Sequence, residues 1–281
     1  MTTPIFETRD AKVSILIPVL NGDQYLQETL DSVLDQQNVG EIVIVDNGST
    51  DKTIEIITRY ASANPKIKLI FCAERGVANA LAYGLRFTAN EFVARIDADD
   101  VMEPGRTARQ IDQLLGDPNL GLVASQITYI DNRSEVIGVS RYPTGVLSLN
   151  RNFAFRNPIA HPSVMFRKSV IQLVGGYRSD FEGAEDLDLW IRVARKFHVF
   201  VDDLPMTRYR SHSSQISNTK NLYASELHLR FRILISKSGW LFRDLLFRLL
   251  QLARILDLAS MNVSSLRRFR NVVKKRIRNR S

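Results

Sequence analysis

The sequence predicts an α/β fold whose first half is a largely parallel sheet with flanking helices. Apolar runs alternate with segments in which apolar residues recur at helical spacing, and the apolar runs end in turn residues or carboxylates. Such alternation is typical of parallel strands joined by crossover helices. A chain of 281 residues with 44% hydrophobic content is long and apolar enough to bury the core that this fold needs.

Four strands and three helices are expected in the first hundred residues. Asn21 and Gly22 form the turn after the first strand, and "NGSTD" at 47–51 forms a turn and a helix cap after the second. The expected strands cover residues 13–20, 41–46, 66–72 and 92–97. The apolar positions of the helices are Leu26, Leu30, Val33 and Leu34, then Ile54, Ile56, Ile57 and Tyr60, with a third helix near residues 78–87.

The middle of the chain mixes shorter signals. A strand "SVMF" at 163–166 follows His161 and Pro162, and a glycine turn at 175–176 leads into a helix that begins near residue 185. Glu185, Asp186 and Asp188 lie in the first turn of that helix. Carboxylates there are ordinarily explained by the helix dipole, so this segment alone does not establish a functional site.

Polar side chains follow all four strands of the predicted sheet. In open α/β sheets, ligands bind beyond the carboxyl ends of the strands, so these side chains are expected to meet at one edge. They are Asn21 after the first strand, Asp46 and Asn47 after the second, Glu74 and Arg75 after the third, and Asp97, Asp99 and Asp100 after the fourth.

The chain has neither the G-x-G-x-x-G pattern of dinucleotide folds nor the G-x-x-x-x-G-K-[ST] phosphate loop. A divalent cation is the obvious substitute, because hard oxygen ligands hold Mg²⁺ or Mn²⁺ and the ion bridges phosphate oxygens. The "DADD" cluster at 97–100 would then be a metal and diphosphate site. The alternative is a solvated acidic loop.

The charge of the chain is unevenly distributed. The net charge is +8, but residues 221–281 contain 14 Lys and Arg against 3 Asp and Glu, which leaves a net −3 for residues 1–220. Such asymmetry is typical of proteins that bind an anionic surface, either membrane or nucleic acid.

The C-terminal segment accounts for that asymmetry. Residues 240–259, "WLFRDLLFRLLQLARILDLA", are too charged to span a bilayer and predict an interfacial or packed amphipathic helix. Residues 266–281 add eight basic and no acidic residues, which suits anionic headgroups. Alternatively, the helix packs on the rest of the protein or on a sister subunit in a homo-oligomer, and the basic end is a solvated tail.

The first dozen residues contain no apolar stretch of the kind found in signal peptides, so a cytoplasmic protein is expected. The single Cys72 agrees with this location, since it excludes an internal disulfide and a cysteine-based zinc site. It is expected to be a small buried hydrophobe.

Seven segments taken in order resemble glycosyltransferase family 2, the inverting nucleotide-sugar transferases with a GT-A fold. They are "VSILIPVLNGDQYLQETLDSVLDQ", "IVIVDNGSTDKT", "ARIDADDVMEPGR", "HPSVMFRKS", "GGYR", "AEDLDLWIRVA" and "YRSHSSQIS". The resemblance covers residues 12 to about 217. It implies a GT-A domain over residues 1–220, with a nucleotide-binding half (1–100) and a mixed acceptor half (101–220). The helical, basic extension (221–281) lies outside the resemblance and is expected from its composition.

The resemblance places the donor site on the acidic cluster. It implies that Asp97 and Asp99 approach the ribose, the diphosphate and its Mn²⁺ or Mg²⁺, with Asp100 as an alternative ligand. His212 resembles a position that reaches back to the metal or the diphosphate, and Arg210 beside it could offset phosphate charge.

The resemblance also places a nucleotide pocket at the first three strand ends. Pro18, Leu20, Asp46 and Asn47 match segments around the nucleobase and ribose, and Arg75 lies where the third strand turns toward them. Many members have two aspartates where this chain has Asp46 and Asn47. Because an amide both donates and accepts hydrogen bonds, uracil, and hence a UDP-sugar, is still expected.

Asp186 matches the catalytic base of the family. Inverting transfer needs a carboxylate within about 3 Å of the attacking hydroxyl, to take its proton as the nucleotide leaves from the opposite face. Glu185 and Asp188 are expected to cap or orient the helix. Trp190 is expected either under a sugar ring or in the core, and His161 is expected to be structural at the acceptor edge.

The sequence therefore predicts a hexosyl- or N-acetylhexosaminyltransferase that adds one sugar to a lipid-linked or cell-surface glycan, as in lipopolysaccharide or capsule synthesis, at the cytoplasmic face of the membrane. A sugar-nucleotide nucleotidyltransferase is the first alternative, but "PVLNGDQYL" lacks the glycine-rich, arginine-containing loop that it needs. A non-catalytic basic protein is the second. Nucleic acid is an unexpected partner, because the body of the chain is acidic.

Overall fold

The computed structural model describes residues 11–147, 149–153, 157–181 and 183–212. The predictions for residues 221–281, which concern a helical basic extension, membrane contact and oligomer formation, lie outside these residues, as does the domain boundary at 220. Within the described ranges, no helix has both the length and the apolar character that crossing a membrane requires.

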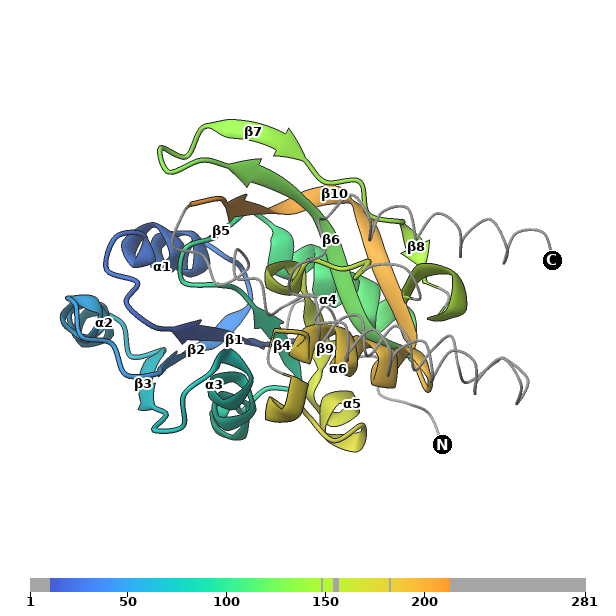
Figure 1. The fold of residues 1–281 in the computed structure, drawn as a ribbon, viewed down its shortest axis with the longest axis horizontal. Coiled ribbons are helices and arrows are strands. Elements are labelled where there is room, and N and C mark those ends of the chain that lie inside the picture. The colour runs from blue at the N-terminus through green and yellow to red at the C-terminus, as the bar shows by residue number, and fades with distance from the viewer. Residues whose placement is uncertain (1–10, 148, 154–156, 182, 213–281) are drawn as a thin grey trace, which may run out of the picture. The chain divides into compact units, whose positions relative to one another are not determined.

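The described chain forms one mixed sheet with helices on both faces (Figure 1). Its first half is parallel throughout, as predicted, with the strand order β3-β2-β1-β4. The strands are β1 (Val13–Val19), β2 (Val39–Asp46), β3 (Ile67–Phe71) and β4 (Phe92–Arg95), and the helices between them are α1 (Leu26–Leu34), α2 (Thr53–Ala63) and α3 (Val77–Gly84).

Two of these elements end earlier than predicted. The fourth strand ends at Arg95 rather than at residue 97, because the chain then turns and the Asp100 N–H donates to the Asp97 carbonyl. The third helix ends at Gly84, and Leu85–Phe87 continue as a 3₁₀ turn. At Gly84 the helix lies so close to the sheet that a Cβ atom would meet Val45 Cγ2 at 2.5 Å.

The second half is mixed, also as predicted. Strand β9 pairs antiparallel with β4 and β6 and so joins the two halves, while β10 runs parallel to β6. The strands are β5 (Val101–Met102), β6 (Leu120–Ile130), β7 (Val136–Val139), β8 (Gly145–Val146), β9 (Met165–Arg167) and β10 (His198–Arg210), and the helices are α4 (Arg106–Gly116), α5 (Lys168–Leu173) and α6 (Glu185–Ala194). Short helical turns cover Leu149–Phe153, His161–Ser163 and Ser179–Phe181.

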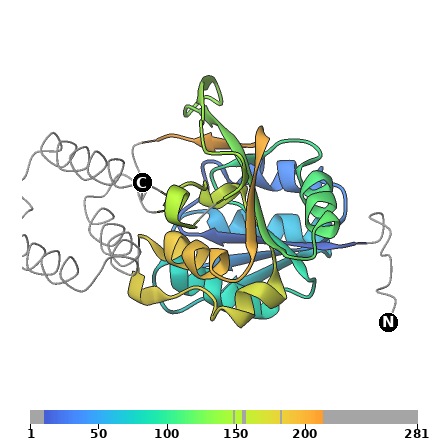
Figure 2. The same cartoon turned by 90° about the vertical axis from the view of Figure 1, so that its right-hand side faces the viewer.

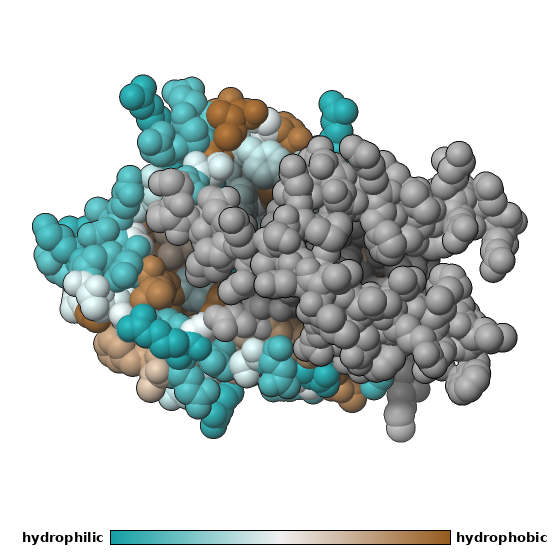
Figure 3. Space-filling view, viewed as in Figure 1, coloured by the Kyte–Doolittle hydropathy of each residue, from teal (hydrophilic) through white to brown (hydrophobic). Residues whose placement is uncertain are grey.

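The strand predicted over "SVMF" starts two residues late, at Met165. The preceding His161–Ser163 segment is a 3₁₀ turn, because Ser163 N–H donates to the Ala160 carbonyl. The hairpin of β6 and β7 projects from the sheet in Figure 2. Val136, Ile137 and Val139 of this hairpin are exposed, and Figure 3 shows brown, hydrophobic atoms in the upper part of the molecule.

The core occupies both faces of the parallel strands. Side chains of β1 alternate between the faces. Ile15 and Ile17 join one cluster with α1, α2 and α4. On the other face, Leu16 lies within 2.6 Å of where a Cβ on Gly84 of α3 would stand. Cys72 is buried, as predicted.

This topology brings distant segments to one edge of the sheet. The carboxyl ends of β1, β2 and β4 share that edge because the three strands are parallel neighbours. Strand β10 arrives at the same place because it pairs antiparallel with β5, placing Arg208 opposite Val101. The end of β10 therefore lies beside the acidic turn at 97–100, about 110 residues earlier in the chain.

Candidate metal and catalytic site

Three carboxylates come together in the turn after β4. One oxygen from each of Asp97, Asp99 and Asp100 lies within 4.8 Å of the others. Asp97 and Asp99 are partly exposed, and Asp100 is fully buried. The structure thus places the three aspartates as the sequence predicts, in a set of hard oxygen donors of the kind that Mg²⁺ and Mn²⁺ prefer.

The electrostatics of this turn fit a divalent cation. Burial raises the pKa of Asp97 and raises the pKa of Asp100 well above its ordinary value, and repulsion from Asp99 adds to both shifts. Asp100 Oδ2 is buried and, among the described residues, has no hydrogen-bond partner. A buried acceptor without a partner is costly, and a bound cation would compensate it and favour the ionised carboxylates. The residues present therefore suit Mn²⁺ or Mg²⁺.

Arg95 provides the nearest positive charge. It is buried at the end of β4, and its Nη1 donates to Asp97 Oδ2 at 2.6 Å while Nη2 donates to Asp97 Oδ1. The sequence reasoning missed Arg95, because it treated residues 92–96 as an apolar strand. A single cation inside that run, two positions before the first carboxylate, was the available signal.

A second arginine lies behind Arg95. Arg106 is fully buried, and its guanidinium donates to the carbonyls of Arg95 and Val164 and to Thr207 Oγ1. Burial, together with repulsion from Arg95, lowers the pKa of Arg106 to about 9. Arg106 thereby connects the end of β4, the residue before β9 and strand β10.

The segment that follows β10 supplies a histidine to the turn. His212 Nε2 lies 2.8 Å from Asp99 Oδ2, and its ring centroid is 5.4 Å from that of Tyr25. The structure thus brings His212 to the predicted metal ligand. Arg210 lies behind the turn, 1% exposed, where its Nε donates to the Asp99 carbonyl at 2.8 Å.

The predicted nucleotide residues lie at the neighbouring strand ends. Pro18 is buried at the end of β1, and Leu20 just after it is 41% exposed. Asp46 is buried and accepts hydrogen bonds from the backbone N–H groups of Gly48 and Ser49, which shapes the turn after β2. These residues lie at the carboxyl edge of the parallel strands, and their contact with a nucleotide stays a prediction.

Asn47 has a structural role in the same region. Its Nδ2 donates to the carbonyls of Cys72 and Glu74, and its Oδ1 accepts from Gly76 N–H at 2.8 Å. The amide therefore joins the end of β2 to the segment after β3, a role that the sequence reasoning missed. Arg75 in that segment is exposed, and a Cβ on Gly48 would lie 3.4 Å from its Nη2.

The predicted base lies at the start of α6. Asp186 is partly exposed, its Oδ2 accepts from Asn157 Nδ2 at 2.6 Å, and its Oδ1 accepts from Leu187 N–H at 2.6 Å. The sequence analysis did not identify Asn157 as a partner of Asp186. Its distance of 29 residues along the chain provided no signal.

The other two carboxylates of α6 orient the helix, as predicted. Glu185 is buried and accepts from Gly183 N–H at 2.7 Å, and burial raises its pKa. Asp188 forms an ion pair with Arg192 one turn later at 2.6 Å, and Arg192 also donates to two carbonyls before the helix. Both side chains therefore have partners within or next to the helix.

An aromatic cluster supports the same helix. Trp190 is fully buried, so of its two predicted positions it takes the core rather than a sugar-facing wall. His161 Nε2 lies 3.0 Å from the Tyr177 hydroxyl, and burial lowers the pKa of His161 well below its usual value. His161 is therefore neutral and structural, as expected.

Comparison with known proteins gives a consistent result. The model of the family described as glycosyl transferase family 2 matches residues 14–174. The O-antigen biosynthesis glycosyltransferase WbnJ of Escherichia coli is 28% identical over 216 residues, which cover 75% of this chain and 84% of WbnJ.

Solved structures share the fold. TarS from S. aureus in complex with UDP-GlcNAc aligns with a TM-score of 0.65 at 16% identity, covering 84% of this chain and 70% of TarS. The mannosyltransferase PcManGT from Pyrobaculum calidifontis, in complex with GDP-Man and Mn²⁺, aligns with a TM-score of 0.61 at 21% identity, covering 81% of this chain and 65% of PcManGT. The architecture is that of GT-A-type enzymes, as the sequence predicts.

Proposed function

The chain belongs to glycosyl transferase family 2, and from this premise we propose that it transfers one sugar, with inversion, from a UDP-sugar to a hydroxyl of a lipid-linked or cell-surface glycan, with Mn²⁺ or Mg²⁺ bound. It is a glycosyltransferase. The observation that supports the proposed chemistry best is the meeting of three carboxylates and His212 at the sheet edge, in a chain whose α6 presents Asp186.

The donor end of the site is suited to a diphosphate with its ion. Asp97, Asp99 and Asp100 would hold the ion together with His212. When bound, a divalent cation stabilises the negative charge that develops on the departing diphosphate, as a Lewis acid. The buried cation Arg95 orients Asp97 by its two hydrogen bonds.

The acceptor end requires a base. In the proposed reaction, the acceptor oxygen attacks the anomeric carbon as the bond from that carbon to the diphosphate breaks, and Asp186 takes the hydroxyl proton. Asn157 Nδ2 and Leu187 N–H each hold one carboxylate oxygen of Asp186 at 2.6 Å. Attack from the face opposite the diphosphate inverts the anomeric configuration.

The choice of UDP and of a surface glycan draws on similar proteins. WbnJ is named for O-antigen biosynthesis, and TarS was solved with UDP-GlcNAc, which supports both choices. PcManGT was solved with GDP-Man and Mn²⁺, so the same fold also accepts guanine, and the test must include both bases. Binding to the cytoplasmic face of a membrane is proposed on the composition of residues 240–281 alone.

Neither alternative function gains support. A nucleotidyltransferase needs the glycine-rich loop that is missing after β1, and Asn21 and Gly22 stand there instead. A purely binding role does not account for the family match or for the carboxylates at the sheet edge.

Thermal unfolding of the full chain tests the proposal, with UDP, GDP and their sugar conjugates in the presence and absence of Mn²⁺. A ligand at 100 times its dissociation constant adds about 2.7 kcal/mol of stability. We expect Mn²⁺-dependent stabilisation by uridine nucleotides, lost in Asp99→Asn and kept in the matched control Asp112→Asn, whose side chain is exposed on α4. Stabilisation by guanine nucleotides alone would replace UDP in the proposal, and none by any nucleotide would refute it.

A further inference from the structure

Arg210 donates hydrogen bonds to three different segments of the chain around the acidic turn. Although only 1% exposed, it lies between the turn after β4, helix α1 and the tip of the β6–β7 hairpin. Its Nε donates to the Asp99 carbonyl at 2.8 Å, and its Nη1 donates to the Asp131 carbonyl at 3.1 Å and Ser134 Oγ at 3.0 Å. Its Nη2 donates to Glu28 Oε2 at 2.5 Å. We call Arg210, Glu28 and Ser134 the clasp.

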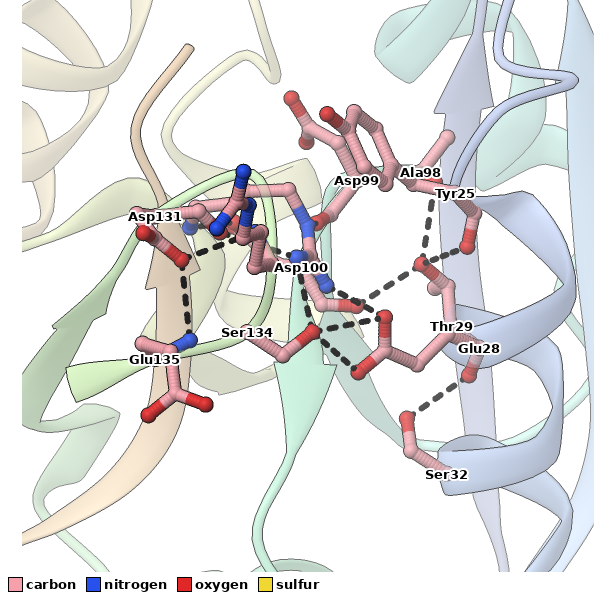
Figure 4. A network of polar contacts seen from close by, with 12 residues as sticks. Tyr25, Glu28, Thr29, Ser32, Ala98, Asp99, Asp100, Asp131, Ser134 and Glu135 are labelled. Carbon is pink, nitrogen blue, oxygen red and sulfur yellow. Dashed lines mark hydrogen bonds and ion pairs between the residues drawn. The ribbon is translucent and has the colours of Figure 1, made fainter.

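The two partners of Arg210 in the clasp also contact each other. Ser134 Oγ donates to both carboxylate oxygens of Glu28, at 3.1 and 3.3 Å, so the hairpin tip and α1 are joined directly (Figure 4). The Arg210 guanidinium carbon lies 4.4 Å from the centroid of the Tyr25 ring. In Figure 4 the side chain of Asp99 points away from Glu28 and Ser134, so the clasp holds the main chain of the turn and leaves the Asp99 carboxylate outside.

Further contacts hold the acidic turn from the end of β10 and from α1. The backbone N–H of Arg210 donates to Asp100 Oδ1 at 2.8 Å, and His212, two residues later, reaches Asp99 Oδ2 at 2.8 Å. From α1, Thr29 Oγ1 lies 2.9 Å from the Ala98 carbonyl and 2.8 Å from the Asp100 carbonyl. Each member of the acidic cluster beyond Asp97 is thus held by β10 or by α1.

Such support matters because the three carboxylates repel one another. Without a cation, repulsion favours conformations of the turn in which the oxygens move apart, and binding must then restore the compact arrangement. Partners that fix the position of metal ligands are known to change metal affinity about 10- to 100-fold when they are removed. Arg210 opposes the spreading of the turn from within, and Glu28 holds the Arg210 guanidinium in place.

We propose that Glu28 and Ser134 are positioning residues that, through Arg210, set the affinity of the acidic turn for the divalent cation and the donor diphosphate. Within the described residues, neither side chain contacts the carboxylates that would bind the ion, and both act through Arg210. The inference rests on the proposed metal-dependent donor binding. It assigns Glu28, a partly exposed residue of α1, a role in donor binding that its position in the sequence does not indicate.

The test uses the full chain with Glu28→Gln, Glu28→Ala and Ser134→Ala. Glu55→Gln is the matched control, because Glu55 lies in the first turn of α2 as Glu28 does in α1, so both substitutions remove the same helix-dipole interaction. The Mn²⁺ concentration that gives half-maximal UDP binding should rise about tenfold for Glu28→Ala, less for Glu28→Gln and Ser134→Ala, and stay unchanged for Glu55→Gln. The turnover rate at saturating Mn²⁺ and donor should stay within about twofold of wild type.

Hydrogen exchange of the ligand-free protein provides a readout independent of activity. Backbone amides of residues 96–102 should exchange faster in the Glu28 variants, while those of β1 keep wild-type rates. An unchanged Mn²⁺ midpoint in Glu28→Ala would overturn the inference, whether or not exchange is faster. A tenfold loss of turnover in Glu28→Ala at saturating Mn²⁺ and donor would also overturn it, because excess ligand should compensate a defect that lies only in donor binding.

The wild-type titration separates this inference from the proposed function. If wild type binds UDP only with Mn²⁺ and the variants match it, the inference fails and the proposed function stands. If wild type binds UDP equally well without the ion, the metal part of the proposed function fails. The inference is then judged by the dissociation constant of UDP alone, and an unchanged constant in Glu28→Ala overturns it.

Discussion

Replacement of the proposed base by its amide, Asp186→Asn, separates chemistry from binding. Both carboxylate oxygens of Asp186 accept hydrogen bonds, Oδ2 from Asn157 Nδ2 and Oδ1 from Leu187 N–H, both at 2.6 Å. An asparagine of the same shape can accept only one of them. Its NH₂ group must then face the other donor, which costs about 1–3 kcal/mol where the site is buried and less here, because residue 186 is partly exposed.

The effect on catalysis should be larger than the effect on stability. Loss of a general base typically lowers the rate about 10²- to 10⁴-fold, or roughly 2.7–5.5 kcal/mol of activation free energy. Donor binding should stay near wild type, because the base acts on the acceptor hydroxyl. The rate is measured as release of nucleoside diphosphate from the donor in the presence of a glycan extract that contains the acceptor. Calorimetric titration measures donor binding, and chemical denaturation measures stability.

Two controls make the result interpretable. Asp180→Asn removes an exposed carboxylate just before α6 and should leave transfer unchanged. The exchange variant Asp186→Asn with Asn157→Asp restores the pairing of one amide with one carboxylate, so it should regain stability without regaining the rate. Near-normal transfer by Asp186→Asn, or recovery of the rate in the exchange variant, would refute the assignment of the base.

Three further predictions concern the framework of the site. Arg95→Met leaves the Asp97 carboxylate without its buried cation and should destabilise the ligand-free protein by about 3 kcal/mol. This is the lower end of the range for a broken buried ion pair, because the Asp97 side chain is 29% exposed. An unchanged denaturation midpoint would contradict the pairing. Gly84→Ala should cost about 1–3 kcal/mol, since its Cβ would stand 2.5 Å from a side chain of β2, whereas Gly116→Ala, with nothing within 4 Å, should be neutral or slightly stabilising in the same melts. Burial raises the pKa of Asp202, but hydrogen bonds led by that from Arg109 outweigh it and lower the pKa to about 2. The resulting contribution of about 2 kcal/mol is therefore complete above about pH 5 and is lost as pH falls through about 2. Asp202→Asn should flatten the acid dependence of stability in that window.

The strand ends illustrate what can be predicted from local pattern. Apolar runs followed by Asp46 or by Asp97, Asp99 and Asp100 predict strands and their exits, and the parallel arrangement places these exits on one edge. The acidic cluster was therefore predictable before any contact was known. The exact strand and helix ends were not, because they depend on a turn hydrogen bond at Asp97 and on the close packing of Gly84.

The supporting residues were not predictable in the same way. Arg95 stood in a segment that its neighbours marked as apolar strand, and Asn157 and Glu28 act on partners that lie 29 and 182 residues away. Asn47 was expected to face a nucleotide, yet its amide is engaged by three backbone groups. Its predicted contact stays a prediction beside the structural role that the fold reveals.

The sequence by itself determined the class of fold, the parallel half with its polar edge, and the family. These follow from features that neighbouring residues express together: hydrophobic period, turn residues and short motifs. Only the tertiary structure decided how the site is supported. The pairing of β10 with β5 brings Arg210 and His212 to a turn formed about 110 residues earlier, and Arg210 then reaches Glu28. Such contacts depend on the free energy of packing the whole sheet, and no local pattern records the partner of a side chain that far along the chain.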